Sequence, residues 1–264
     1  MSEVIVITSG KGGVGKTTTS ANLGTALSLE NKKTVIVDAD IGLRNLDVVM
    51  GLENRIVYDI VDVVEGTCRL KQALIKDKRF DNLFLLPAAQ TRDKNAIKSE
   101  QMVELCQELK ESFDYVIMDC PAGIEQGFKN AIAGCDRAIV VTNPEISAVR
   151  DADRIIGLLE ANEIKDIKLV INRIKQDMVN RGDMMDKQDI IEILAIDLIG
   201  LVPDDESIII STNKGEPAIL DSKSPAGQAY KNIAKRVLGE EVPFQEFATQ
   251  GGFFSKLKRL VLAK

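Results

Sequence analysis

The segment from Gly10 to Thr17 contains the residue types and spacing with the clearest chemistry in this sequence. Gly10, Gly15, Lys16 and Thr17 match the phosphate-binding-loop (P-loop) pattern: two glycines separated by four residues, then a lysine and a hydroxyl residue. Glycines let consecutive backbone N–H groups curve around phosphate oxygens, and a following helix N-terminus adds partial positive charge. We expect Lys16 to neutralise the β- and γ-phosphates and Thr17 to hold Mg²⁺. A glycine-rich turn that binds nothing is the alternative.

Lys11 is a second lysine within this loop. The P-loop pattern does not require a lysine there, so the residue type alone allows either a functional role or an accident of the surface. The apolar run at residues 4–7 predicts a buried strand before the loop, and residues 17–29 predict a helix after it. This context favours phosphate binding over an inert turn.

Aspartates stand at the ends of two predicted strands. The strand over residues 34–37 runs into Asp38 and Asp40, and the strand over 115–118 ends in Asp119. An aspartate that ends a hydrophobic strand is typical of the Walker B position, whose carboxylate reaches Mg²⁺ through a coordinated water. Beside a Mg²⁺ triphosphate, Asp38 and Asp40 can divide the work, one holding a metal-bound water and the other orienting the attacking water. Ordinary acidic or capped turns are the alternatives.

Two further strand ends suggest contacts with a nucleotide base. Asn172 and Arg173 follow the predicted strand at 168–171, and Pro203 and Asp204 follow the strand at 198–202. The Asn172 side chain offers both a donor and an acceptor, which match the N6 and N1 edge of adenine, and Arg173 can stack on the ring. An asparagine that caps the next helix is the alternative.

The residue content excludes several kinds of chemistry. No histidine occurs among the 264 residues, so the usual general base and the commonest metal ligand are missing, which argues against serine hydrolases and zinc enzymes. No secretory signal precedes the first strand, so we expect reduced thiols in a cytosolic protein. No apolar run approaches the ~20 residues that span a bilayer. The cysteines lack metal-binding spacing, and they are Cys68, Cys106, Cys120 and Cys135.

The chain reads as alternating strands and helices. The pattern predicts a single-domain α/β P-loop fold with a mostly parallel, twisted sheet and helices on both faces. We expect an ATPase domain over residues 1–239, a linker over 240–250 and an amphipathic membrane-targeting helix over 251–264. Besides the strands already given, the sequence predicts strands at 83–86 and 138–141 and helices around 102–113, 147–159 and 225–238.

The last fourteen residues differ from the rest of the chain. They contain four cations and no acid, so the net charge of −6 becomes −10 for the body that precedes them. At helical spacing, apolar side chains gather on one side and cations on the other, as in helices that lie in the interface of anionic membranes. A terminal helix that docks on the core is the alternative. The membrane-binding residues are expected to be Phe253, Phe254, Lys256, Leu257, Lys258, Arg259, Leu260 and Val261.

Taken together, these segments resemble the MinD/ParA family of deviant Walker A ATPases, over essentially the whole chain. The loop at 11–18, the acidic segment at 38–47, the run at 119–123 and Gly215-Glu216-Pro217 carry the resemblance. It implies that Lys11 reaches the phosphates of a partner subunit, while Lys16 acts on those of its own subunit. It also implies that Asp40 positions the attacking water. The implied nucleotide-binding loop is Gly10, Lys11, Gly12, Gly13, Val14, Gly15, Lys16, Thr17 and Thr18.

The resemblance also implies roles in binding the metal, the base and partner proteins. Thr17 binds Mg²⁺, Asp38 and Asp119 reach it through water, and Asn172 recognises adenine. Residues 147–157 are a candidate surface for partners, which lie near the dimer interface in the family. With its tail, the chain resembles the membrane-binding branch of the family.

That branch dimerises on ATP, attaches to the cytoplasmic face of the cell membrane and recruits the division inhibitor MinC to place the division septum. An ATPase stimulator such as MinE releases it. We expect ATP/ADP and Mg²⁺ as cofactors, anionic lipids as a partner, and no specific nucleic acid because the body is acidic. Alternatives are a DNA-partitioning ATPase of the ParA type, an iron–sulfur carrier and a non-enzymatic nucleotide-binding scaffold.

Overall fold

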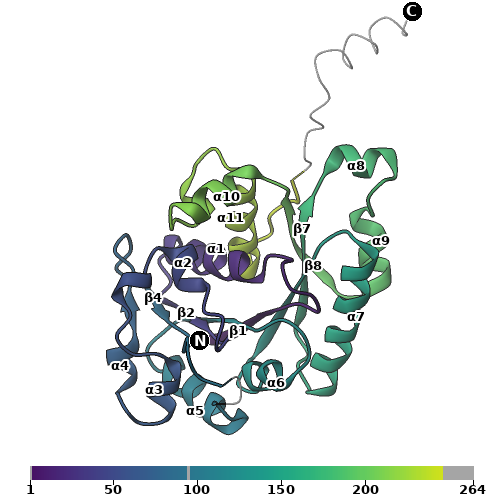
Figure 1. The fold of residues 1–264 in the computed structure, drawn as a ribbon. Coiled ribbons are helices and arrows are strands. Elements are labelled where there is room, and N and C mark those ends of the chain that lie inside the picture. The colour runs from purple at the N-terminus through teal and green to yellow at the C-terminus, as the bar shows by residue number, and fades with distance from the viewer. Residues whose placement is uncertain (1, 94–95, 246–264) are drawn as a thin grey trace, which may run out of the picture.

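An eight-stranded sheet forms the centre of the fold (Figure 1). The computed structural model describes residues 2–93 and 96–245, so the predicted helix at 251–264 lies outside the described residues. The strand order is β3-β4-β2-β5-β1-β6-β7-β8, and among these described strands only β3 runs antiparallel to its neighbour. The strands are β1 (Glu3–Thr8), β2 (Thr34–Asp38), β3 (Ile75–Lys76), β4 (Leu83–Leu86), β5 (Tyr115–Asp119), β6 (Arg137–Thr142), β7 (Ile167–Ile174) and β8 (Asp197–Pro203).

The strands form because their residues are apolar and mostly β-branched on both faces. In β1, Val4 and Val6 belong to the core on one face of the sheet, whereas Ile5 and Ile7 belong to the core on the other. All four side chains are fully buried. A strand that is apolar at consecutive positions needs cover on both sides, as expected for a parallel sheet.

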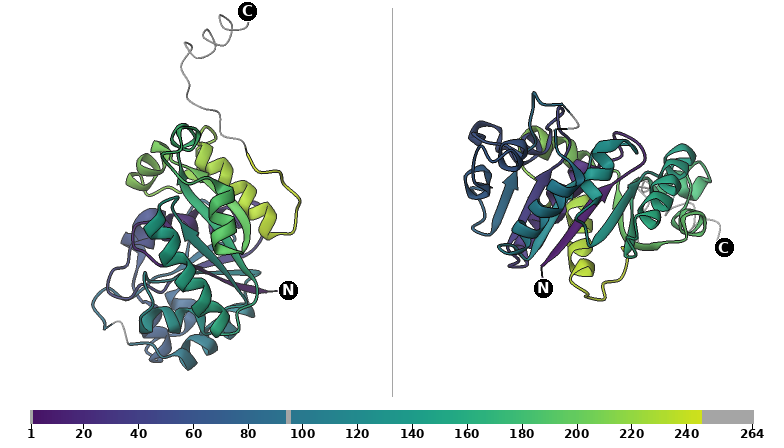
Figure 2. Two further views of the ribbon diagram at one scale, coloured as in Figure 1. Left: turned by 90° about the vertical axis from the view of Figure 1, so that its right-hand side faces the viewer. Right: turned by 90° about the horizontal axis from the view of Figure 1, so that it is seen from below.

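Helices provide that cover on each face of the sheet (Figure 2). One core contains residues of α1 (Lys16–Leu29), α2 (Leu46–Met50) and α11 (Pro225–Val237). The other contains residues of α3 (Ile60–Val64), α4 (Leu70–Ala73), α5 (Ser99–Lys110), α6 (Gln126–Ile132), α7 (Ile146–Ala161) and α9 (Lys187–Leu194). The remaining helices of the described residues are α8 (Gln176–Arg181), α10 (Glu206–Asn213) and the 3₁₀ turns η1 (Glu53–Arg55) and η2 (Ala218–Leu220).

Strand β1 lies between β5 and β6, and the chain leaves it toward β2 on the β5 side. The later strands β6, β7 and β8 continue the sheet on the other side. In open parallel sheets, ligands bind outside the carboxyl ends of the strands where the strand order reverses in this way. We call that side the carboxyl edge and the opposite side, where these strands begin, the amino edge.

The predicted fold class is confirmed, and each strand predicted from the sequence is present. Two features were not predicted. The short antiparallel strand β3 has only two residues, too few for a periodic pattern. Strand β7 continues past Asn172 to Ile174, through a register shift relative to β8 between Ile171 and Ile174.

The first residues after α11 pack back onto that helix. Arg236 donates from Nε to the Val242 carbonyl at 3.0 Å and from Nη2 to the Pro243 carbonyl at 3.0 Å. Its guanidinium carbon lies 4.1 Å from the centre of the Phe244 ring. The beginning of the predicted 240–250 linker is therefore held against the body through Arg236.

Candidate nucleotide-binding site

The loop between β1 and α1 has the backbone shape of an anion-binding site. Gly13 and Gly15 have φ values of 77° and 102°, in the left-handed region that glycine adopts without strain. Helix α1 has no side-chain hydrogen bond at its N-cap, Gly15, so no side chain of the cap competes for its first backbone N–H groups. A loop of this shape at a helix N-terminus can bind phosphate.

Lys16, the first residue of α1, lies within the loop. Its residue is 8% exposed, and its Nζ donates to the Ser9 hydroxyl at 2.9 Å. Burial lowers the pKa of Lys16, while the nearby carboxylates of Asp119 and Asp40 act to raise it. The lysine is thus a largely desolvated cation, and its charge acts strongly on any anion in the loop.

Lys11 points to a different part of the molecule. Its Nζ lies 3.6 Å from Glu145 Oε2 and 3.4 Å from Ser147 Oγ, at the start of α7. Nearly half of the Lys11 side chain is exposed, in contrast to Lys16. The structure therefore separates the two lysines of the loop, one inside it and one on the surface.

Asp38 and Asp119 are direct neighbours on adjacent strands, paired in the register of β2 and β5. Both are almost completely buried. Asp38 accepts hydrogen bonds from the backbone N–H groups of Asp40 at 3.0 Å and Leu46 at 3.3 Å. Asp119 accepts one from the Ser20 hydroxyl at 2.9 Å. The pair thus joins β2, β5 and α1 at the carboxyl edge.

Two buried carboxylates side by side resist ionisation. Burial, reinforced by the charge of Asp119, raises the pKa of Asp38 to about 8. Burial also raises the pKa of Asp119 to about 6, although hydrogen bonds from the hydroxyls of Thr17 and Ser20 and the charge of Lys16 oppose this rise. A divalent cation at this place would favour the ionised form of both.

The donor set at this place fits Mg²⁺. The Thr17 hydroxyl and the carboxylates of Asp38 and Asp119 are hard oxygen groups of the kind that Mg²⁺ prefers. Within residues 2–93 and 96–245, no group of three or more Asp, Glu, Cys or His side chains could hold a metal by itself. Mg²⁺ typically uses one or two carboxylates together with waters and substrate phosphates, so a complete protein cage is not needed.

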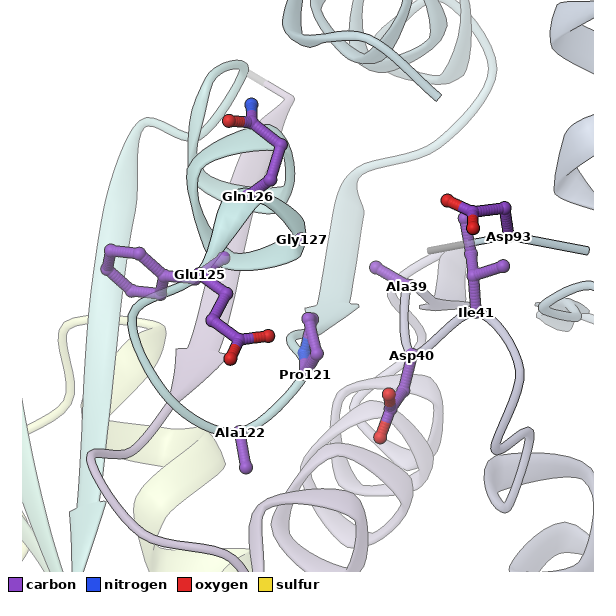
Figure 3. Close-up of a pocket in the computed structure, with 10 residues that line it drawn as sticks. Ala39, Asp40, Ile41, Asp93, Pro121, Ala122, Glu125, Gln126 and Gly127 are labelled. Atoms are coloured by element: carbon purple, nitrogen blue, oxygen red, sulfur yellow. The ribbon is translucent and has the colours of Figure 1, made fainter. Parts of the chain in front are cut away.

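Asp40 lines a cavity of about 270 Å³ between the loop after β2 and the loop after β5. Figure 3 shows its carboxylate on one side of Pro121 and the Glu125 carboxylate on the other. Asp93 also contributes to the wall. Glu125 and Asp93 were not singled out from the sequence, because neither belongs to a motif and both reach the cavity only through folding.

The residues predicted to contact a base gather at the ends of β7 and β8. Asn172 is 6% exposed, and its side-chain amide donates to the Val14 carbonyl of the P-loop at 2.7 Å. It belongs to β7 rather than to a helix cap, because α8 begins four residues later. Arg173 is exposed, Pro203 ends β8, and the Asp204 carboxylate lies 3.1 Å from Lys175 Nζ.

Ser9 and Ser20 are functional candidates that the sequence reasoning missed. Ser9 receives the Lys16 hydrogen bond and donates its own hydroxyl proton to the Lys11 carbonyl at 2.8 Å. Ser20 holds Asp119. One signal was present in the sequence, since Ser20 lies four residues after Lys16, on the same face of a helix.

All four cysteines are free thiols, and Cys68, Cys106 and Cys120 are buried. Burial raises the pKa of Cys106 to about 12. Thiols in this state are poor metal ligands, since the thiolate is the form that binds. The iron–sulfur alternative thus gains no support from the described residues.

The phosphate-binding loop after the central strand, its buried lysine and the neighbouring aspartates define a P-loop ATPase. Residues 2–178 match a family model described as an AAA domain. The chain is 63% identical over 261 residues to the septum site-determining protein MinD of Bacillus subtilis, covering 98% of this chain and 97% of the relative. It is 49% identical over 269 residues to MinD of Escherichia coli, covering 98% and 99%. The chain belongs to the MinD family of septum site-determining ATPases.

Solved structures agree with this assignment. The MinC:MinD complex of Aquifex aeolicus includes a chain with a TM-score of 0.88 and 50% identity, covering 93% of this chain and 99% of that one. MinD of Pyrococcus horikoshii, complexed with Mg-ADP, has a TM-score of 0.82 and 30% identity, covering 90% and 96%. A ParA family ATPase of Chlorobium tepidum has a TM-score of 0.78 and 24% identity, which shows only the shared fold, so the ParA alternative is less well supported.

Proposed function

We propose that this chain binds ATP with Mg²⁺ in the P-loop and hydrolyses it, with the roles that the sequence suggested for each residue. The observation that carries this proposal is the buried Asp38–Asp119 pair beside Lys16, because such a cluster is costly unless a cationic ligand is bound there. The Mg-ADP complex of the Pyrococcus horikoshii relative supports the choice of ligand. Bound Mg²⁺ would neutralise phosphate charge as the bond to the γ-phosphate breaks.

The chain's own residues then act mainly by positioning. Lys16 would meet the β- and γ-phosphates, Thr17 and the two buried aspartates would hold Mg²⁺, and the loop N–H groups would bind phosphate oxygens. Asp40 lines the cavity between the loop after β2 and the loop after β5, where its carboxylate can orient the attacking water. Asn172, Arg173, Pro203 and Asp204, at the ends of β7 and β8, would contact the adenine.

We further propose that ATP makes the chain a dimer through Lys11. The surface position of this lysine supports the idea, since its Nζ lies beside Glu145 and Ser147 rather than inside its own loop. A partner's lysine on the γ-phosphate would stabilise the developing charge as an arginine finger does. ADP lacks this phosphate, and the dimer should therefore depend on ATP.

The Asp40→Ala variant tests this dimer. We expect it to bind ATP without hydrolysing it, so that light scattering detects a long-lived dimer with ATP and a monomer with ADP. Asp93→Ala is the matched control, because it removes a second carboxylate from the wall of the same cavity. A monomeric Asp40→Ala protein in saturating ATP would show that dimerisation is not coupled to the nucleotide.

Membrane attachment is proposed from the sequence of the tail. No helix within residues 2–93 and 96–245 has the length and hydropathy to cross a bilayer. The cationic, amphipathic pattern of residues 251–264 supports peripheral binding to anionic lipids on the inner face of the cell membrane. One short helix binds weakly, and a dimer presents two, which raises the effective affinity.

Liposome co-sedimentation tests this step with the full chain and a variant lacking residues 251–264. We expect ATP to bring the full chain onto anionic vesicles and ADP to leave it in solution. The deletion variant should bind ATP normally but remain in solution, in keeping with a domain at 1–239 that precedes the linker and the tail. Equal sedimentation of the full chain with either nucleotide would contradict the switch.

The partners follow from the relatives. The MinC:MinD complex of Aquifex aeolicus supports MinC as a partner of this chain, and a stimulator such as MinE would complete the cycle. The candidate surface at residues 147–157 lies on α7, and we extend it by one residue to Ile146, which is 66% exposed beside the Lys11 contact. Binding of purified MinC that requires ATP and is lost in Ile146→Asp, at unchanged ATPase activity, would support this surface.

A further inference from the structure

Side chains hold three carbonyl groups of the P-loop. The Ser9 hydroxyl donates to the Lys11 carbonyl at 2.8 Å, and the Thr19 hydroxyl donates to the Gly15 carbonyl at 2.8 Å. The third bond comes from Asn172, whose amide donates to the Val14 carbonyl at 2.7 Å. A loop that binds anions must turn its N–H groups toward the ligand and its carbonyl groups away, because carbonyl oxygens repel phosphate.

The bond from Asn172 differs from the other two in its origin. Ser9 and Thr19 are local, whereas Asn172 lies 158 residues from Val14 in the sequence and comes from β7. Val14 is 2% exposed and Asn172 is 6% exposed, so water has little access to either group. A buried carbonyl without a donor is unfavourable, and Asn172 supplies this donor.

The backbone around Asn172 is shaped to deliver its side chain to the loop. The pairing of β7 with β8 shifts register between Ile171 and Ile174. Within this irregularity Arg173 has a φ of 57°, in the left-handed region that arginine rarely adopts. Such irregularities redirect a side chain relative to a regular strand, and strained backbone persists where the surrounding structure requires it.

The loop is also shaped to receive Asn172. A Cβ atom at Gly15 would lie 2.2 Å from the Asn172 side-chain nitrogen, which is closer than any real contact. Gly15 therefore does more than permit a φ of 102°, because its missing side chain lets the amide lie directly against the loop. Loop and strand fit each other at this point.

We propose that Asn172 is a positioning residue of the phosphate cradle, which it orients by holding the Val14 carbonyl away from the phosphates. This inference rests on the proposed nucleotide site and extends it. The role suggested by the family resemblance was recognition of adenine alone. One amide N–H is used by Val14, which leaves the side-chain oxygen and the second N–H for a base. The same residue then links the base end of the site to its phosphate end.

Ligands with and without a base distinguish the two roles. The full chain and its Asn172→Ala and Asn172→Asp variants are titrated with Mg²⁺–ATP and with Mg²⁺–tripolyphosphate, which has no base. Asn172→Asp keeps the shape but replaces the donor with a carboxylate, whose charge also repels phosphate, so the uncharged Asn172→Ala is the reference variant. We expect both variants to lose affinity for tripolyphosphate by about tenfold to a hundredfold, and for ATP by at least that factor, because ATP also loses the contact between its base and the Asn172 amide. Loss of ATP affinity with unchanged tripolyphosphate affinity would overturn the proposal and leave recognition of the base as the only role.

Asn82→Ala is the matched control at the other end of α1. The Asn82 amide donates to the Ser28 carbonyl at 2.9 Å and the Lys32 carbonyl at 3.1 Å. Asn82 also accepts a hydrogen bond from the Ser28 hydroxyl at 2.8 Å, so its removal costs more hydrogen bonds than that of Asn172 and should lower the thermal stability at least as much. Both ligands should nevertheless bind as they do to the unmodified chain. Equal losses of ligand affinity in Asn82→Ala and Asn172→Ala would indicate general destabilisation and contradict the proposal.

Amide hydrogen exchange in the free protein gives an answer that does not depend on a ligand. We expect exchange of residues 9–16 to be faster in Asn172→Ala and unchanged in Asn82→Ala. Unchanged exchange of this loop in Asn172→Ala would overturn the positioning role. If the unmodified chain bound neither ligand, the proposed nucleotide site would be wrong, and loop exchange would still decide whether Asn172 orders the loop.

Discussion

The two edges of the sheet carry similar charged residues in opposite surroundings. At the amino edge, Arg137 Nε lies 3.2 Å from Glu3 Oε1 and also bonds Asp166, in partly exposed positions. Lys168 Nζ lies 2.8 Å from Asp197 Oδ2. At the carboxyl edge, two aspartates lie side by side and almost fully buried, and backbone N–H groups and hydroxyls donate hydrogen bonds to them.

This difference separates charges that stabilise the fold from charges that serve a ligand. Exposed ion pairs remain hydrated, so they cost little and contribute little. Burying neighbouring carboxylates opposes folding, and such groups persist where a function needs them. The same sheet carries both groups of charges, which differ in how deeply they are buried and in whether each carboxylate is paired with a cation. Substitutions at each edge test this interpretation.

The largest expected effect is on hydrolysis, from Lys16→Ala. Removing the buried cation beside the proposed phosphates should lower kcat about a thousandfold, since it acts on charge that develops in the reaction. Phosphate release measured at saturating ATP checks this. Arg137→Ala at the amino edge should keep its activity. If Lys16→Ala retained hydrolysis within tenfold of the unmodified chain, the distinction between the edges would fail.

The next effect concerns stability in the absence of nucleotide and Mg²⁺. The pKa values of Asp119 and Asp38 are raised to about 6 and about 8, above the value of about 4 in the unfolded chain. The folded chain therefore binds protons more tightly, and the free energy of unfolding should fall as pH rises from about 4 to 8. Asp38→Asn should remove the upper part of this fall, on the order of 2 kcal/mol between about pH 6 and 8.

Urea unfolding at about pH 6 and pH 8 measures this change in the free energy of unfolding. Asp197→Asn at the amino edge is the control with the opposite sign, because Lys168 lowers the pKa of Asp197. A carboxyl with a lowered pKa contributes stability that is present at neutral pH and lost on acidification. The exposed Asp197 should contribute little. A fall in stability from pH 6 to 8 that is as large in Asp38→Asn as in the unmodified chain would contradict the buried-pair interpretation.

The smallest effect should come from Lys168→Ala. Lys168 pairs with Asp166 and Asp197, and Asp197 is 82% exposed. Loss of these pairs should lower the free energy of unfolding by about 0.5 kcal/mol, less at high salt, with unchanged hydrolysis. Denaturation at low and high ionic strength checks it. A loss of several kcal/mol would mean that the amino edge also depends on strongly coupled charges.

Much of the architecture could be predicted because it depends on local patterns. Runs of apolar, β-branched residues gave the main strands, and the glycine and lysine spacing of the loop gave the P-loop. Asp38 and Asp119 were placed at the same edge because both follow strands of one parallel sheet. The tail was also interpreted from spacing alone, and its role stays a prediction because those residues lie outside the described structure.

The contacts between distant residues could not be predicted in this way. The sequence placed Asp38 near Asp40, whereas the register of β2 and β5 made Asp119 its buried neighbour. The sequence assigned Lys11 and Lys16 to one loop. In the structure the Lys11 side chain lies on the surface beside Glu145, at the start of α7. From the sequence, Asn172 was predicted to contact a base or to cap a helix. The structure adds a contact with the Val14 carbonyl, which the irregular end of β7 makes possible.

The sequence by itself therefore determined the strands, the loop and the chemical groups available for nucleotide binding, since periodicity and motif spacing are local properties of the chain. The tertiary structure decided which of these groups are buried together, which lysine remains outside, and which distant side chain orders the loop. Those features depend on strand register and side-chain packing between segments far apart in sequence, and local propensities do not encode them.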